Sequence, residues 1–426
     1  MKGWYTAAIV ALVAFGWGQS KPVQASDLER VLDTGKPILD VRGRIDYADD
    51  GAKPDRADAN TVRLRMGYET GQWNGLSALA EFDQVWALGD DYNSTRNGEL
   101  SYAVVPDPAL TVLNRLQLKY SPLESLSLVL GRQRLTVSNQ RVIGNSDWRQ
   151  HEQTFDAVSI SDSTFAGMLL NYAYVSQVNR PVGPADPLPN SGPASHFDCD
   201  CHFLSGEYEG VPNVRLGAYE ILLDMSQKSG PPSARAAVEA WDTATAGVRA
   251  EIKQVLRDTL SAGLNVEYAT QSNYGHNRAH FRLGYWVAEA SLRSEALSLT
   301  GGYEVLQGNG TAAFVTPLAS LHPFNGWADV FSTTPIFGLR DAHIGAGYTI
   351  LSPGGFRSLS MTLVRHEFRT DRYSKYLGGE WNASSEFVVD QRLSILASYA
   401  SYQGSTRTSV APKDKSEFVL QARYKL

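Results

Sequence analysis

The residues from Gly131 to Ala157 include many side chains that could do chemistry. This stretch, GRQRLTVSNQRVIGNSDWRQHEQTFDA, is dense in Arg, Gln and Asn, and it holds a single tryptophan, Trp148, and the pair His151 and Glu152. Guanidinium and amide groups present several planar donors that bind carboxylates well. The stretch is therefore a catalytic site, the lining of a ligand-binding surface, or a solvated loop of unusual composition.

Known catalytic motifs find little support in the chain. His151-Glu152 is not followed by the second histidine of the zinc-protease helix motif, and no Gly-x-Ser-x-Gly elbow occurs. The acidic segment ADDGAKPDRADAN lacks the ligand spacing of an EF-hand, which favours a solvated loop over a calcium site. We expect no enzyme activity, no cofactor and no metal, although barrels that act as hydrolases leave an enzyme as an alternative.

Two cysteines, Cys199 and Cys201, lie in the run Asp-Cys-Asp-Cys-His. We expect an exposed loop that holds either a local disulfide or free thiols. A Cys/Cys/His metal site with His202 is an alternative, but three ligands so close in sequence cannot complete a cage alone.

The N-terminus is typical of an exported protein. Lys2 precedes an apolar stretch, and Val23-Gln24-Ala25 resembles a cleavage site, so we expect a signal peptide over residues 1–25 and a mature chain over 26–426. An N-terminal membrane anchor is the alternative, but the apolar stretch is shorter than the roughly 20 residues that a spanning helix needs. The net charge of −6 suggests no nucleic-acid partner.

Period-two alternation of apolar and polar residues predicts β-strands. Leu264, Val266 and Tyr268 share one face, whereas Asn265 and Glu267 share the other. A soluble sandwich also alternates, but strands of about 9–13 residues with aromatic residues near their ends favour a membrane barrel with an apolar exterior.

Short and long connections alternate along the chain, which is typical of periplasmic turns and extracellular loops in a barrel. The expected turns are 71–73, 121–124, 162–164, 210–213, 254–258, 292–296, 351–355 and 387–390. The expected longer connections are 48–60, 87–110, 135–153, 178–201, 225–242, 271–279, 306–339, 369–374 and 403–413. We therefore predict one all-β transmembrane antiparallel barrel of about 18 strands in the outer membrane, with membrane lipid as one partner.

A barrel of this size leaves an aqueous lumen, so the polar strand faces are expected to carry the function. In the expected mature chain, residues 26–426, arginine is about three times as frequent as lysine. Closure makes the first and last strands neighbours, which predicts one connected basic patch. The arginines either bind anionic solutes or brace the wall through ion pairs with carboxylates. The candidates on strands are Arg42, Arg44, Arg63, Arg65, Arg115, Arg249, Arg282 and Arg423.

Two segments resemble the alginate-export family of outer-membrane barrels. The first is GRQ…NQRVIGNSDWRQHEQTFDA, and the second is HPFNGWADVF at 322–331, followed by Gly-Leu-Arg-Asp at 338–341. The resemblance implies passive passage of an anionic polysaccharide such as alginate through an arginine-lined lumen. It adds Arg132, Arg134 and Arg149, with Arg141 as a further candidate, to the expected pathway. It also implies that the last strand is read by the barrel-assembly machinery.

Two other functions stay open. One is a porin for small anionic or aromatic nutrients, and the other is a barrel that transports nothing and serves as an anchor or enzyme.

Overall fold

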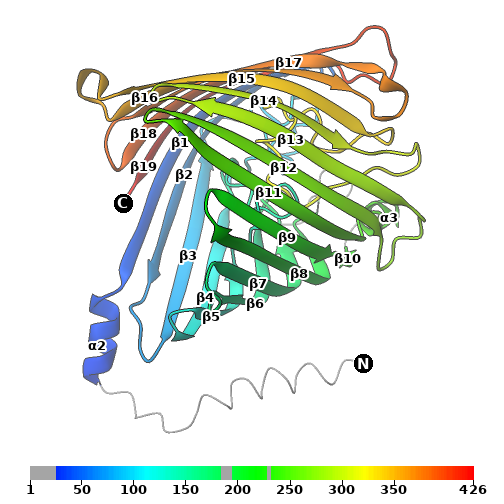
Figure 1. The fold of residues 1–426 in the computed structure, drawn as a ribbon. Helices are drawn as coiled ribbons and strands as arrows, with labels where there is room; N and C mark the ends of the chain where they lie inside the picture. The colour runs from blue at the N-terminus through cyan, green and yellow to red at the C-terminus, as the bar shows by residue number, and fades with distance from the viewer. Residues whose placement is uncertain (1–24, 184–193, 228–231) are drawn as a thin grey trace.

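The computed structural model describes residues 25–183, 194–227 and 232–426 (Figure 1). The expected signal peptide therefore lies outside the described residues, apart from Ala25. Helix α2 (Ala25–Asp33) precedes the first strand, and helix α3 (Pro232–Glu239) lies in a long connection. Among the described residues, no helix has the length and apolar character needed to cross a membrane.

Eighteen long strands of the described chain form one closed antiparallel barrel, as predicted, and Figure 1 shows the first strand beside the last. They are β1 (Lys36–Asp50), β2 (Ala57–Glu69), β3 (Leu76–Ala87), β4 (Thr111–Leu123), β5 (Leu126–Gln133), β6 (Thr154–Asp162), β7 (Met168–Asn179), β8 (His196–Val211), β9 (Val214–Leu222), β11 (Thr243–Arg257), β12 (Leu260–Asn273), β13 (Arg282–Arg293), β14 (Leu297–Leu306), β15 (Leu339–Leu351), β16 (Ser358–Arg369), β17 (Tyr376–Val388), β18 (Leu393–Gly404) and β19 (Lys415–Lys425). A short strand, β10 (Met225–Ser226), pairs with β8.

The outer face of the barrel is apolar, and the inner face is polar. On β12, Leu264, Val266 and Tyr268 are exposed, whereas Glu267 and Ala269 on the opposite face are buried. A soluble sandwich would bury its apolar face, so this inverted arrangement identifies a barrel that spans a lipid bilayer. The protein is thus an outer-membrane β-barrel.

The alternation of connection lengths is also confirmed, with differences at some strand ends. Strand β1 continues to Asp50 and β2 begins at Ala57, although a connection over 48–60 was expected. Strand β8 begins at His196, inside the expected connection 178–201. Backbone pairing extends strands beyond the apolar band because the ladder of hydrogen bonds does not require apolar side chains.

The cysteines are placed differently from the expectation of an exposed loop. Cys199 and Cys201 form a disulfide and lie buried on the inner face of β8. Residues two apart on a strand point to the same side, so both sulfur atoms face inward. His202 lies on the opposite face, where its ring contacts Tyr172, so the three residues do not form a metal site.

The bilayer environment predicts how one substitution changes stability. We expect Val266→Arg to lower the free energy of unfolding by about 2–4 kcal/mol, because it places a charge in the apolar band. Ser291→Arg on the inner face of the adjacent strand β13 is the matched control and should cost much less. Denaturant unfolding in lipid vesicles measures both, and equal losses would contradict the assignment of the two faces.

Candidate functional site: a basic wall and two inward loops

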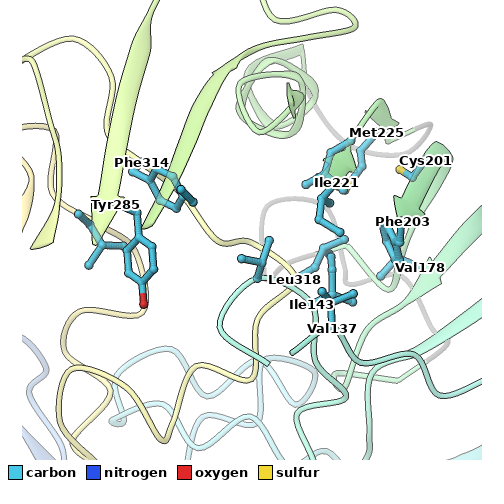
Figure 2. Packing of buried hydrophobic residues seen from close by; sticks show 14 of the residues in the cluster. Val137, Ile143, Val178, Cys201, Phe203, Ile221, Met225, Tyr285, Phe314 and Leu318 are labelled. Atoms are coloured by element: carbon cyan, nitrogen blue, oxygen red, sulfur yellow. The ribbon is translucent and has the colours of Figure 1, made fainter. Parts of the chain in front are cut away.

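Two long connections fold into the barrel and meet there. The first inward loop is residues 134–153, between β5 and β6, and the second inward loop is residues 307–338, between β14 and β15. Ile143 and Leu318 are fully buried and pair as a parallel bridge. Figure 2 shows Val137 and Ile143 of the first loop beside Leu318 of the second, facing Ile221 of the wall. The stretch from Gly131 to Ala157 therefore contains a loop that packs inside the lumen.

Polar and aromatic contacts also join the two loops. Arg149 donates to Asp329 at 2.5 Å, and the Gln153 side chain donates to the Leu318 carbonyl at 2.9 Å. The rings of Trp148 and His322 stack with 3.8 Å between their centroids. Both segments that resembled the alginate-export family thus contribute to one internal constriction.

Three arginines of the wall hold the first inward loop. Arg42 donates to the Gln150 side chain and to the Asp147 carbonyl, both at 2.9 Å. Arg44 donates to the Trp148 carbonyl at 2.6 Å, and Arg63 donates to the Gln150 carbonyl at 3.2 Å. These guanidinium groups are almost fully buried, so their main contacts are with the loop.

A second group of arginines is bridged by carboxylates. Arg65 makes a bidentate pair with Asp83, at 2.6 and 2.7 Å, and also contacts Glu152 of the first inward loop. Glu152 pairs with Arg134 in turn. The remaining members of this group are Arg115, which pairs with Glu81 at 2.6 Å, and Arg423, which pairs with Asp40 at 2.6 Å.

Strand register explains how these residues come together. Arg42 faces Arg63 on β2 on one side and Arg423 on β19 on the other, because closure puts β1 between β2 and β19. Like charges on adjacent strands repel, and carboxylates such as Asp40, which lies 2.9 Å from Arg63, offset that repulsion.

The basic wall is defined here as the inward-facing arginines of β19, β1, β2 and β4, with Arg134. Three of them keep part of the side chain in contact with solvent: Arg115 at 16%, Arg134 at 31% and Arg423 at 27%. Arg132 was expected on the pathway, but it lies on the outer face of β5, because it pairs in register with exposed Leu116. There it holds Asp156 through two bonds of 2.7 and 2.9 Å. The same inner faces and the adjoining connections carry carboxylates that match these arginines, namely Asp40, Asp46, Glu81, Asp83, Asp107, Glu152 and Glu417. The partly exposed guanidinium groups are therefore the positive charges of the wall that solvent can reach.

The other candidate arginines lie away from this wall. Arg249 on β11 faces the lumen and pairs with Glu251 at 2.6 Å. Arg141 is buried at the second inward loop, where it pairs with Glu304 at 2.7 Å. Arg149 joins the two loops, as described above.

Arg282 was expected to face the lumen, and that expectation is wrong. Strict alternation on β13 buries Tyr285 and exposes Trp286, and Arg282 shares the outer face with Trp286. The residue begins its strand on the side of the long connections, where an outward charge costs little because it lies near the membrane surface.

Sequence reasoning missed another part of the lumen wall. Strands β13 to β17 carry inward carboxylates and histidines, including Glu289, Glu304, Asp341 and Glu380. It also missed Asp107, which is buried in the connection between β3 and β4, where it accepts from the Gln150 backbone at 2.7 Å. The period-two pattern of the sequence indicates that these strand residues face inward. Only closure of the barrel determines where they lie relative to the basic wall.

His151 and Glu152 take separate roles. Burial lowers the pKa of His151, and its Nε2 lies 3.1 Å from the Pro108 carbonyl oxygen. Burial alone would raise the pKa of Glu152, but Arg65 and Arg134 outweigh it and bring that pKa to about 2. Because each side chain contacts a different part of the wall, His151 and Glu152 give no support to a catalytic role.

Comparison with known proteins adds solved structures of the same fold. Acinetobacter baumannii OccAB2 superposes with a TM-score of 0.69 at 15% identity, covering 93% of this chain and 99% of that chain. Pseudomonas aeruginosa OpdK with vanillate gives 0.68 at 15% identity with the same coverage. Pseudomonas aeruginosa OccK3 (OpdO) gives 0.66 at 16% identity, covering 94% and 97%. At these identities the likeness establishes the fold.

No family model and no curated protein matches the sequence. The expected membership of the alginate-export family is therefore wrong, because the similar structures are Opd and Occ barrels and one of them was solved with vanillate. The expected passage of a polysaccharide is wrong for the same reason. The two segments that suggested it owe their composition to the inward loops.

The ion pairs of Glu152 with Arg65 and Arg134 predict how the attachment of the first inward loop depends on pH. The pKa of Glu152 falls from 4.5 to about 2 on folding, so its stabilisation is complete above pH 4.5 and is lost as the pH falls toward 2. Glu152→Gln should weaken the attachment of the first inward loop by about 3–5 kcal/mol at pH 7, because it leaves buried Arg65 without one partner.

Hydrogen–deuterium exchange of residues 134–153 measures this attachment. We expect protection to fall at least about tenfold in the variant and to lose its dependence on pH below 4.5. Glu209→Gln removes the carboxylate of an exposed Arg–Glu pair and serves as the control, with little expected change. Unchanged protection in Glu152→Gln would show that the bridge does not hold the loop.

Proposed function

We propose that this protein is a passive outer-membrane channel for small anionic solutes, with small aromatic carboxylates as the favoured class. The observation that carries the proposal is the row of partly exposed arginines that borders the lumen beside the inward loops. Arg115, Arg134 and Arg423 each present a guanidinium group to solvent while a carboxylate holds it in place.

The size of the solute is limited by the inward loops. They reach from the basic wall, at Arg42 and Arg63, to β12 on the far side of the barrel, where Gln271 donates to the Val315 carbonyl of the second loop at 2.9 Å. Buried contacts link the two loops along this path. A lumen filled in this way favours small molecules that pass one at a time over polymers.

The charge of the solute follows from the partly exposed arginines of the wall. Guanidinium groups bind carboxylates through two parallel hydrogen bonds. OpdK, a barrel of the same fold, was crystallised with vanillate, and this supports an aromatic carboxylate as the solute. We also propose that the barrel carries out no catalysis and that the assembly machinery reads β19.

Bilayer recordings test the proposal. We expect a reversal potential that indicates anion selectivity, and saturable flux of vanillate and benzoate into proteoliposomes. The double change Arg115→Gln and Arg134→Gln should shift selectivity toward cations and lower vanillate flux several-fold, because Glu81 and Glu152 would then lack these arginine partners.

Arg282→Gln is the matched control, since it removes one arginine from the outer face of the barrel. It should leave selectivity and flux unchanged. Cation selectivity of the unaltered protein, or an absence of conductance in a folded barrel, would contradict the proposal. Equal effects of the double change and the control would contradict the role given to the basic wall.

A further inference from the structure

Two histidines and an aspartate gather on the lumen wall at β15 and β16, outside the basic wall. Asp341 and His343 lie on β15 and His366 lies on β16, and all three face inward. His343 and His366 are direct neighbours in register, with ring centroids 5.4 Å apart. One potential ligand atom from each of the three residues lies within 4.8 Å of the others.

The hydrogen bonds at this cluster leave one imidazole nitrogen without a partner. His366 Nδ1 lies 2.9 Å from both carboxylate oxygens of Asp341, and His343 Nε2 lies 3.1 Å from Glu289 Oε2. His343 Nδ1 is buried and has no partner. A carboxylate that holds one nitrogen of an imidazole while the other nitrogen stays free is the usual support of a metal-binding histidine.

The local charge also favours a bound cation. Asp341 and Glu289 form ion pairs only with His366 and His343 among the described residues. The nearby arginines are engaged elsewhere: Arg365 pairs with Glu367, and Arg141 pairs with Glu304. Among the described residues, the ion-pair partners of these two carboxylates are therefore imidazoles, with no arginine or lysine.

We propose that Asp341, His343 and His366 form a lumen-facing site for a divalent transition metal such as Zn²⁺ or Cu²⁺. Two imidazoles and a carboxylate suit these metals, whereas Mg²⁺ and Ca²⁺ prefer oxygen ligands. Bonds of about 2.0–2.1 Å at tetrahedral angles set ligand atoms about 3.3 Å apart. The 2.9 Å contact between His366 and Asp341 needs only a few tenths of an ångström to meet that spacing.

The open edge of the site lies at His343. Its side chain is 15% exposed and that of Glu289 is 40% exposed, whereas Asp341 is buried. An ion can therefore arrive from the lumen and complete its coordination with water. Glu289 orients His343 from behind and acts as a positioning residue.

The site also touches the internal constriction. Asn325 of the second inward loop donates to Asp341 at 3.3 Å and accepts from Arg141 of the first inward loop at 2.8 Å. A metal ion on Asp341 would compete with the Asn325 contact. Metal binding is thus expected to alter the constriction as well as the charge of this wall.

Calorimetric titration of the detergent-solubilised barrel with Zn²⁺ tests the site directly. We expect one Zn²⁺ per chain at micromolar affinity and no comparable binding of Mg²⁺. His343→Gln with His366→Gln should abolish this binding, and Glu289→Gln should weaken it about 10–100-fold as an orienting partner. Electron paramagnetic resonance of bound Cu²⁺ should show coupling to nitrogen that disappears in the double variant.

His276→Gln is the matched control. His276 belongs to a second Asp/Asp/His cluster, with Asp224 and Asp242, that has one imidazole and lies in the long connections. The control should leave the tight binding unchanged. Far-UV circular dichroism and heat-modifiable electrophoretic mobility report whether each variant is folded.

Three results would overturn the proposal: no Zn²⁺ binding below about 1 mM, unchanged binding in the folded double variant, or loss of binding in His276→Gln. These measurements do not depend on transport. Failure of the proposed channel function would leave the metal titration unaffected, and the converse also holds.

Discussion

The structure depends on one constraint, which is that backbone polar groups in a bilayer must be hydrogen-bonded within the protein. A β-sheet meets this requirement only by closing into a barrel. Here β1 pairs with β2 on one side and with β19 on the other. Closure brings residues that are about 380 positions apart in sequence into one ion pair, between Asp40 and Arg423. The basic wall is a consequence of that closure.

Closure also creates an interior that must be filled or left to water. The two inward loops fill much of it, and wall arginines satisfy the loop carbonyl groups that would otherwise be buried without partners. This explains why the arginines of the wall have two different roles. The buried members, such as Arg42 and Arg63, hold the first inward loop, and the partly exposed members, such as Arg115 and Arg134, are the ones that a solute can reach.

The two sides of the lumen differ in chemistry. The basic wall combines arginines with carboxylates, whereas the wall around Asp341 and Glu289 combines carboxylates with imidazoles. The proposed anion path and the proposed metal site therefore occupy different parts of the lumen wall. Asn325 and Arg141 connect them, so that occupation of one side can influence the other.

The sequence by itself determined the barrel, its strand number, its two faces and most of its turns, because alternation with period two is a local property that the bilayer makes visible. It also located most of the inward-facing arginines, with Arg132 and Arg282 as the exceptions. It did not determine the course of the inward loops, the burial of Cys199 and Cys201, or the meeting of His343 with His366. Those depend on contacts between distant segments, such as Ile143 with Leu318, that no local pattern encodes. Only the tertiary structure decided which charges are neutralised inside the protein and which remain available to a solute, because that depends on the three-dimensional position of each partner.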